Sequence, residues 1–174
     1  MERNFKKGTY HHLYNRGANK LDIYRNDSDY KYFLRKLKHY SEKYSISILC
    51  YCLMPNHFHL FVKQNTSELS IGKMIGNLIN SYTKTINLKY DRSGVLFEGP
   101  TQSRHIMDES YFLWLFKYII LNPVEVELVN KATDWEYSAI HEYLGFRRNE
   151  LLDIDEMREI LGSVSQIRDF LELD

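Results

Sequence analysis

Two histidines separated by one residue are the first side chains in this sequence that could do chemistry together. His57 and His59 stand in the segment HFHLFV, and alternate residues of a β-strand point to one face of a sheet. Their Cα atoms would lie roughly 7 Å apart at a strand rise of about 3.3 Å per residue, so both imidazoles could converge on one metal ion. Surface or hydrogen-bonded histidines also occur at this spacing, so the pair alone leaves both interpretations open.

A tyrosine and an asparagine four residues apart form a second pair. Tyr118 and Asn122 stand in the run FLWLFKYIILNP, and residues four apart lie on one face of a helix. Asparagine offers a neutral carbonyl oxygen as a third metal ligand, and the phenol of tyrosine is a nucleophile. A helix packed in the core would give the same run, so here too both interpretations stay open.

The other reactive side chains in the sequence are two cysteines. Cys50 and Cys52 have C-x-C spacing, which matches neither a zinc ribbon nor a redox pair, and two cysteines cannot build a disulfide framework. We expect them to be buried and inert.

The charge of the chain is unevenly distributed. The formal net charge is zero, but residues 1–107 hold 17 Lys and Arg against 8 Asp and Glu, while residues 108–174 hold 6 against 15. A basic first part predicts a surface that binds a polyanion, with an acidic appendage after it; solvated faces would explain the same asymmetry. The candidate phosphate contacts, predicted as a group, are Lys6, Lys7, Arg16, Lys20, Lys63, Lys73, Lys84 and Arg104. Exposed tyrosines could stack on bases.

These side chains must be positioned by a small set of helices and strands. Hydrophobic periodicity predicts strands over 8–16, 46–53, 57–63 and within 100–107. It predicts helices over 27–44, over 67–89 with Ser67 as the cap, and over 108–121, where Asn122-Pro123 ends the third helix. The order β-α-β-β-α-β predicts an α+β, ferredoxin-like (RRM-like) fold, an antiparallel sheet with helices on one face.

The rest of the chain predicts a helical extension. Two or three short amphipathic helices follow Glu136, so we expect one domain over 1–130 and a C-terminal extension over 131–174, partly packed on the domain. The 174 residues, 44% of them apolar, suffice for a core. No stretch is long enough to cross a bilayer and no targeting segment is evident, so we expect a soluble, cytoplasmic protein without a membrane partner.

Several segments together resemble a known family. The stretch YCLMPNHFHL over 51–60 resembles the MPNHxHL signature of the HUH single-tyrosine transposases, in which His, a hydrophobic residue and His hold the catalytic metal. The branch that it resembles is that of the REP-associated tyrosine transposases (RAYT), by agreement over 10–17, 94–99 and 118–124 and a weaker echo over 135–139. The resemblance spans about residues 8–145.

The resemblance implies roles for the residues above. Tyr118 would be the catalytic nucleophile, and His57, His59 and Asn122 would be the metal ligands. The family nicks and rejoins single-stranded DNA near hairpins, such as REP-like palindromes, through a covalent 5′-phosphotyrosine intermediate. A prokaryotic, nucleoid-associated enzyme that acts as a monomer is then expected. The family also places a histidine at the position of His11, where a supporting role or simple packing are both open.

Ligand chemistry and the family resemblance predict different metals. Two imidazoles and an amide oxygen suit zinc, nickel or cobalt by ligand softness, whereas the family works with Mg²⁺ or Mn²⁺. We follow the family, because three neutral ligands leave the ion its full charge and open positions for phosphate oxygens. Two other functions stay open: a non-catalytic regulator of ferredoxin-like fold that binds single-stranded nucleic acid, and a metal-dependent nuclease that uses water.

Two segments depart from the family pattern. Glu125 and Glu127 replace the arginine and glycine of NPVRAGLV, and a GRFKS-like basic stretch is replaced by residues 99–103, followed by Arg104. We expect altered DNA contacts there and an active enzyme with a different target preference.

Overall fold

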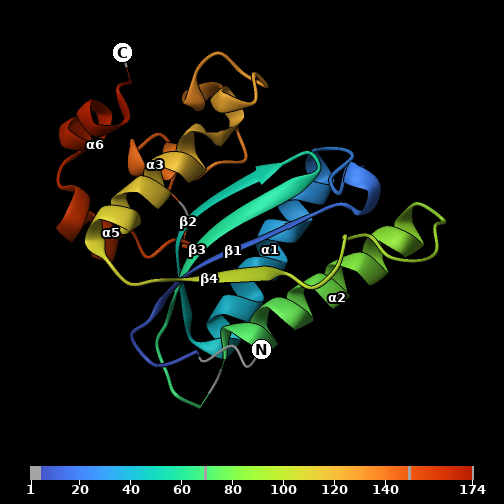
Figure 1. Cartoon of the computed structure of the whole chain (residues 1–174). Coiled ribbons are helices and arrows are strands. Elements are labelled where there is room, and N and C mark those ends of the chain that lie inside the picture. Colours follow the sequence, from blue (N-terminus) through green and yellow to red (C-terminus); the bar gives the residue numbers. More distant parts are fainter. Residues whose placement is uncertain (1–4, 69, 149, 174) are drawn as a thin grey trace.

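The computed structural model describes residues 5–68, 70–148 and 150–173, and its centre is a four-stranded sheet (Figure 1). The strands lie in the order β2-β3-β1-β4, and each neighbouring pair is antiparallel. Two helices connect the strands in the predicted β-α-β-β-α-β order, so the α+β, ferredoxin-like prediction is confirmed. These elements are β1 (Tyr10–Arg16), α1 (Asp27–Tyr44), β2 (Ile46–Met54), β3 (His57–Gln64), α2 (Ile71–Lys89) and β4 (Gln102–Ile106), followed by α3 (Glu109–Glu125).

Different helices cover the two faces of the sheet. On β3 the side chain of Phe58 points to the face covered by α1 and α2, and its ring packs against α1. His57, His59 and Phe61 point to the other face because side chains alternate along a strand. There the ring of Phe61 lies 4.5 Å from that of Phe112 on α3. The two histidines therefore share their face of the sheet with α3.

The apolar character of α3 follows from its place between two layers. Phe112 contacts the sheet, while Phe116 contacts Tyr143 of the short helix α4 (Ile140–Tyr143), with ring centroids 4.9 Å apart. A helix that is hydrophobic on most sides is buried on most sides. Among the helices described here, none combines the length and the hydropathy that a membrane span requires.

Two predicted helix ends are wrong. The third helix does not stop at Asn122-Pro123: Pro123 lies within α3, and Val126 donates a backbone hydrogen bond to Asn122. Proline removes one backbone donor, and the burial of both residues holds the last turn in helical form against the local preference. Helix α2 begins after Ser70, whose hydroxyl accepts a backbone hydrogen bond in the first turn, so Ser70 and not Ser67 is the cap.

The segment after residue 130 packs along the outer edge of β2. Backbone hydrogen bonds join residues 137–139 to Tyr51 and Leu53, and Asp153 to Ile48. The edge strand is thereby covered, which is one way in which proteins protect a sheet edge. The division at residue 130 stays a prediction. The remaining elements are the 3₁₀ turns Ala18–Lys20 and Ala132–Asp134 and the helices α5 (Ile154–Leu161) and α6 (Val164–Leu171).

Candidate functional site

The two histidines lie at the start of β3, directly after a tight turn. The backbone N–H of Gly17 donates to the carbonyl of Asn56 in this turn at 2.7 Å, which joins it to the end of β1. A Cβ atom at Gly17 would lie 1.9 Å from the carbonyl oxygen of Leu21, so only glycine fits this close approach. The turn holds His57 and His59 at one end of the sheet.

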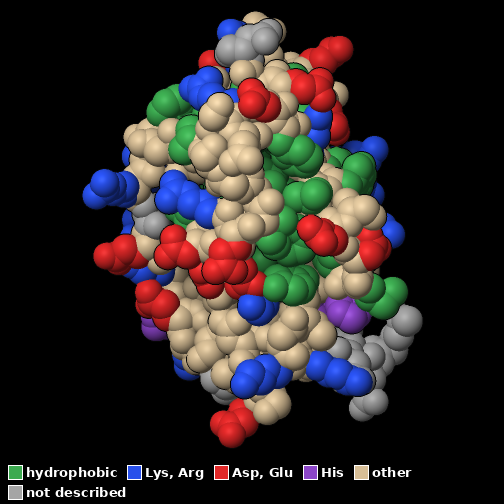
Figure 2. All heavy atoms as spheres, turned by 90° about the vertical axis from the view of Figure 1, so that its left-hand side faces the viewer, with side chains coloured by type: hydrophobic (Ala, Val, Ile, Leu, Met, Phe, Trp, Pro, Cys, Tyr) green, Lys and Arg blue, Asp and Glu red, His purple; other side chains and the backbone are tan. Residues whose placement is uncertain are grey.

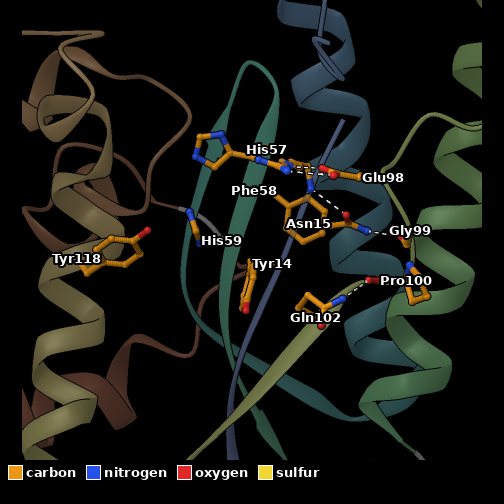
Figure 3. A pocket seen from close by; sticks show the side chains of 11 residues that line it. Tyr14, Asn15, His57, Phe58, His59, Glu98, Gly99, Pro100, Gln102 and Tyr118 are labelled. Atoms are coloured by element: carbon orange, nitrogen blue, oxygen red, sulfur yellow. Dashed lines mark hydrogen bonds and ion pairs between the residues drawn. The ribbon is translucent and has the colours of Figure 1, made fainter. Parts of the chain in front are cut away.

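Helix α3 brings the tyrosine and the asparagine to the same end. Asn122 Oδ1 lies 3.1 Å from Nε2 of His57, and the Tyr118 ring centroid lies 5.3 Å from that of His59. Figure 3 shows the Tyr118 side chain reaching from α3 toward the histidines. Because α3 stays helical through Asn122, the two residues lie one turn apart. The chain thus gathers in space the four residues that the resemblance implicated.

A cavity of about 620 Å³ opens beside this cluster (Figure 3). Its far wall is the loop over 98–101, which Asn15 holds by donating from Nδ2 to Gly99 O at 2.9 Å and to Thr101 Oγ1 at 3.2 Å. The lining residues are Tyr14, Asn15, Arg16, His57, Phe58, His59, Glu98, Gly99, Pro100, Gln102 and Tyr118. The cavity has room for a nucleotide next to the cluster.

Burial determines the protonation of the cluster. It lowers the pKa of His57, and it lowers the pKa of His59 to about 2, with the neighbouring histidines acting in the same direction. Both imidazoles are therefore neutral at pH 7, as metal ligation requires. Burial and then the Glu125 carboxylate raise the pKa of Tyr118, while the Asn122 side chain acts in the opposite direction. Tyr118 is thus a neutral phenol at rest.

A third histidine, which the sequence did not single out for this role, adjoins the pair. Nε2 of His12 on β1 lies 2.9 Å from Nδ1 of His59, and both side chains are buried. The position suggested by the resemblance, His11, points to the other face, where its ring stacks on His105 at 5.1 Å. The strand alternation predicts that only one of two consecutive histidines can face the site, but not which one.

The donor set fits a cation. The ring of His57 has an amide oxygen at each nitrogen: Asn56 Oδ1 lies 2.7 Å from Nδ1 and Asn122 Oδ1 lies 3.1 Å from Nε2. A neutral imidazole has one N–H, so when Nδ1–H donates to Asn56 Oδ1, the Nε2 lone pair of His57 is left beside Asn122 Oδ1. A cation between Nε2 of His57 and Oδ1 of Asn122 would satisfy both atoms. Among the described residues no three His, Cys, Asp or Glu side chains form a metal cluster.

Comparison with known proteins identifies the family. Residues 6–117 match the family model described as transposase IS200 like. The chain belongs to the IS200-like transposase family. The match includes His57 and His59 and ends one residue before Tyr118, so it covers the histidine pair but neither Tyr118 nor Asn122 of α3.

A sequence relative of this transposase carries the name of the branch that the sequence resembles, and a solved structure shares its fold. A protein of Haemophilus influenzae named as a REP-associated tyrosine transposase is 25% identical over 119 residues, which are 63% of this chain and 67% of that protein. A solved structure of a REP-associated tyrosine transposase bound to a REP hairpin matches with a TM-score of 0.70. It is 16% identical and the match covers 88% of this chain and 93% of that one, which supports the fold.

Three predicted phosphate contacts of the transposase lie on the face of the histidines, and two of them have acidic partners. Arg16 lines the cavity and forms an ion pair with Glu98. Lys63 bonds to Glu156 of α5 at 2.6 Å. Arg104 on β4 lies with its guanidinium carbon 4.2 Å from the ring centroid of an α3 tyrosine.

The other predicted contacts lie before or after β1, or on the helix that covers the opposite face of the sheet. Lys6 and Lys7 are exposed before β1, and Lys20 is exposed after it. Lys73 and Lys84 are exposed on α2, which covers the opposite face of the sheet. The role of all eight in DNA binding stays a prediction. The two cysteines, Cys50 and Cys52, are buried, and burial raises the pKa of both thiols.

Proposed function

We propose that this chain is a metal-dependent endonuclease and strand transferase that acts on single-stranded DNA, with Tyr118 as its nucleophile. One observation carries the proposal: the Tyr118 ring faces His59 at 5.3 Å, and Asn122, one helical turn later, contacts His57. A nucleophile and a neutral N,N,O donor set at one point suit phosphoryl transfer. Membership of a transposase family supports the same chemistry.

In this reaction the chain's residues hold and cut one phosphodiester. His57, His59 and Asn122 would hold Mg²⁺ or Mn²⁺, which when bound polarises a phosphate oxygen. The Tyr118 oxygen forms a bond to phosphorus and gives up its proton, while the bond from phosphorus to the 3′ oxygen breaks and that oxygen takes up a proton. The product is a 5′-phosphotyrosine. A 3′-hydroxyl of another strand can reverse the step and rejoin DNA without an external energy source.

The substrate we propose is single-stranded DNA beside a hairpin, of the kind formed by REP-like palindromes. The solved relative bound to a REP hairpin shares the fold, which supports a hairpin as partner. Because Tyr118 faces the histidines of its own chain, one molecule supplies every residue of the reaction. We therefore propose that a monomer is active.

A labelling experiment tests the nucleophile. The protein is incubated with Mn²⁺ and hairpin oligonucleotides from its own genomic flanks, labelled at the 5′ or the 3′ end. We expect covalent label on the protein from 3′-labelled DNA alone, and none with Tyr118→Phe. Tyr40→Phe, on α1 at the opposite face of the sheet, is the matched control and should keep the adduct.

The same experiment separates the other functions. Cleavage without an adduct that persists in Tyr118→Phe would mean that water is the nucleophile. Binding of the hairpin without cleavage would mean that the chain is a non-catalytic regulator.

A further inference from the structure

Three aromatic side chains form a continuous stripe along α3 that ends at Tyr118. The rings of Tyr111 and Trp114 are 5.2 Å apart between centroids with an interplanar angle of 26°, and those of Trp114 and Tyr118 are 5.1 Å apart at 8°. The spacing of three and four residues places all three on one face of the helix. The proposed nucleophile is therefore the last ring of a stack.

The middle ring of the stripe is open to solvent. Trp114 is 52% exposed, although it is the largest side chain on a helix most of whose residues are buried or half-buried. Rings in direct face-to-face contact lie about 3.5–4.0 Å apart, so centroids at 5.1 and 5.2 Å mean that the rings are offset. Part of the indole face is thus left uncovered by its neighbours.

The surroundings of the stripe suit a nucleic-acid strand. Arg104 of β4 is exposed and holds its guanidinium 4.2 Å from the Tyr111 ring centroid, at the far end of the stripe from the histidines. Tyr118 lines the cavity beside the histidines, and so does Tyr14, which is 39% exposed. A strand that leaves the cavity past Tyr118 and follows the stripe would meet the rings of Trp114 and Tyr111 and then the guanidinium of Arg104.

We propose that Trp114 stacks on one unpaired base of the DNA strand, next to the phosphate that Tyr118 attacks. An exposed indole in an aromatic stripe with an exposed guanidinium at its far end can stack on a single strand, because every base has a π face. Arg104 contacts a phosphate of the same strand. The inference rests on the proposed function, because it takes Tyr118 as the point of cleavage.

The test measures whether the effect of Trp114 on DNA affinity depends on the presence of one particular base. In the Tyr118→Phe protein, which cannot cut, the affinity for a hairpin oligonucleotide is measured by fluorescence anisotropy, with and without Trp114→Ala. The measurement is repeated with oligonucleotides that carry one abasic site at each unpaired position around the cut. We expect Trp114→Ala to weaken binding of the intact strand roughly 5- to 20-fold. One abasic site should weaken binding of the Trp114 protein by the same factor and have no further effect on Trp114→Ala.

Controls and contrary outcomes distinguish stacking from a structural role. Trp114→Phe should keep most of the affinity, and Phe146→Ala, which removes an exposed ring from the C-terminal extension, should leave it unchanged. If Trp114→Ala weakens binding equally for every abasic strand, or slows adduct formation without changing affinity, Trp114 only supports Tyr118 and the inference is wrong. An adduct with wild-type protein but no coupling to a base overturns this inference alone; no binding of any hairpin overturns the proposed function as well.

Discussion

His12 shows how one side chain can act on the site through another. A histidine that ligates a metal through Nε2 carries its proton on Nδ1, and the 2.9 Å contact lets His59 Nδ1–H donate to Nε2 of His12. His12 would thereby fix the tautomer and the ring orientation of His59. We predict that His12→Ala weakens Mn²⁺ binding about 10- to 100-fold, as measured by the EPR signal of free Mn²⁺.

The neighbouring residue provides the control for this prediction. His11→Ala removes an imidazole from the same strand, but on the face away from the site. It should leave Mn²⁺ affinity within about twofold of wild type. Equal losses in the two variants would mean that the strand has been disturbed and that His12 has no specific role.

His11 itself should make stability depend on pH. Burial and then the charge of His105 lower the pKa of His11 to about 4, and its ring contacts Phe5, Thr9 and Ser103. The unfolded chain binds this proton below about pH 6.5 and the folded chain only below about pH 4. The contribution of neutral His11 to the free energy of unfolding is therefore complete above pH 6.5 and falls as the pH drops toward 4.

Urea unfolding at several pH values checks this dependence. One proton contributes a slope of up to about 1.4 kcal/mol per pH unit. We expect the free energy of unfolding of His11→Gln to fall less steeply than that of wild type between pH 6.5 and 4. Parallel curves for the two proteins would contradict the assignment.

At the scale of elements, one arginine joins the C-terminal segment to β2. Arg147 donates from Nε and Nη2 to the two carboxylate oxygens of Glu142 at 2.9 and 3.0 Å, and from Nη2 to the hydroxyl of Tyr51 at 2.9 Å. Glu142 is 1% exposed. Because a buried carboxylate without its cation is costly, we predict that Arg147→Met lowers the free energy of unfolding by about 3–5 kcal/mol.

A double variant separates the pair from the packing around it. Adding Glu142→Gln to Arg147→Met removes the stranded charge and should recover part of the loss in a urea titration. If the double variant has a lower free energy of unfolding than Arg147→Met, as expected when two substitutions act independently, the ion pair with Glu142 is not the source of the stability that Arg147 provides.

The elements differ in how far the sequence predicts them. The hairpin of β2 and β3 follows from strand alternation around the MPN turn, and with it the shared face of His57 and His59. The C-terminal boundary of α3 does not follow, because burial of Pro123 outweighs its local preference. The same is true of Trp114: its spacing from Tyr118 is visible in the sequence, but its exposure depends on which side of α3 the C-terminal helices cover.

At the scale of the whole molecule, the acidic part of the chain, residues 108–174, lies against the basic part, residues 1–107. Figure 2 shows the side of the molecule formed by α3, α5 and α6, where Asp and Glu side chains are interspersed with Lys and Arg. Ion pairs cross between the two parts of the chain, from Lys38 to Glu150 and from Lys63 to Glu156. The uneven charge of the sequence is thus partly neutralised in the fold, and Lys63, on the face of the histidines, is one of the residues affected.

Releasing Lys63 from its partner should change how the protein binds DNA. Glu156 contacts Lys63 with both groups largely buried, so Glu156→Gln leaves an ammonium group that can neutralise a phosphate. We predict tighter binding of single-stranded hairpin DNA at low salt and a plot of log K against log salt that is steeper by about 0.7, the release of one counterion. Glu159→Gln removes an equal charge from the exposed side of the same helix and should raise affinity without steepening the plot. If both variants give the wild-type slope, Lys63 does not reach the DNA and its predicted phosphate contact is wrong.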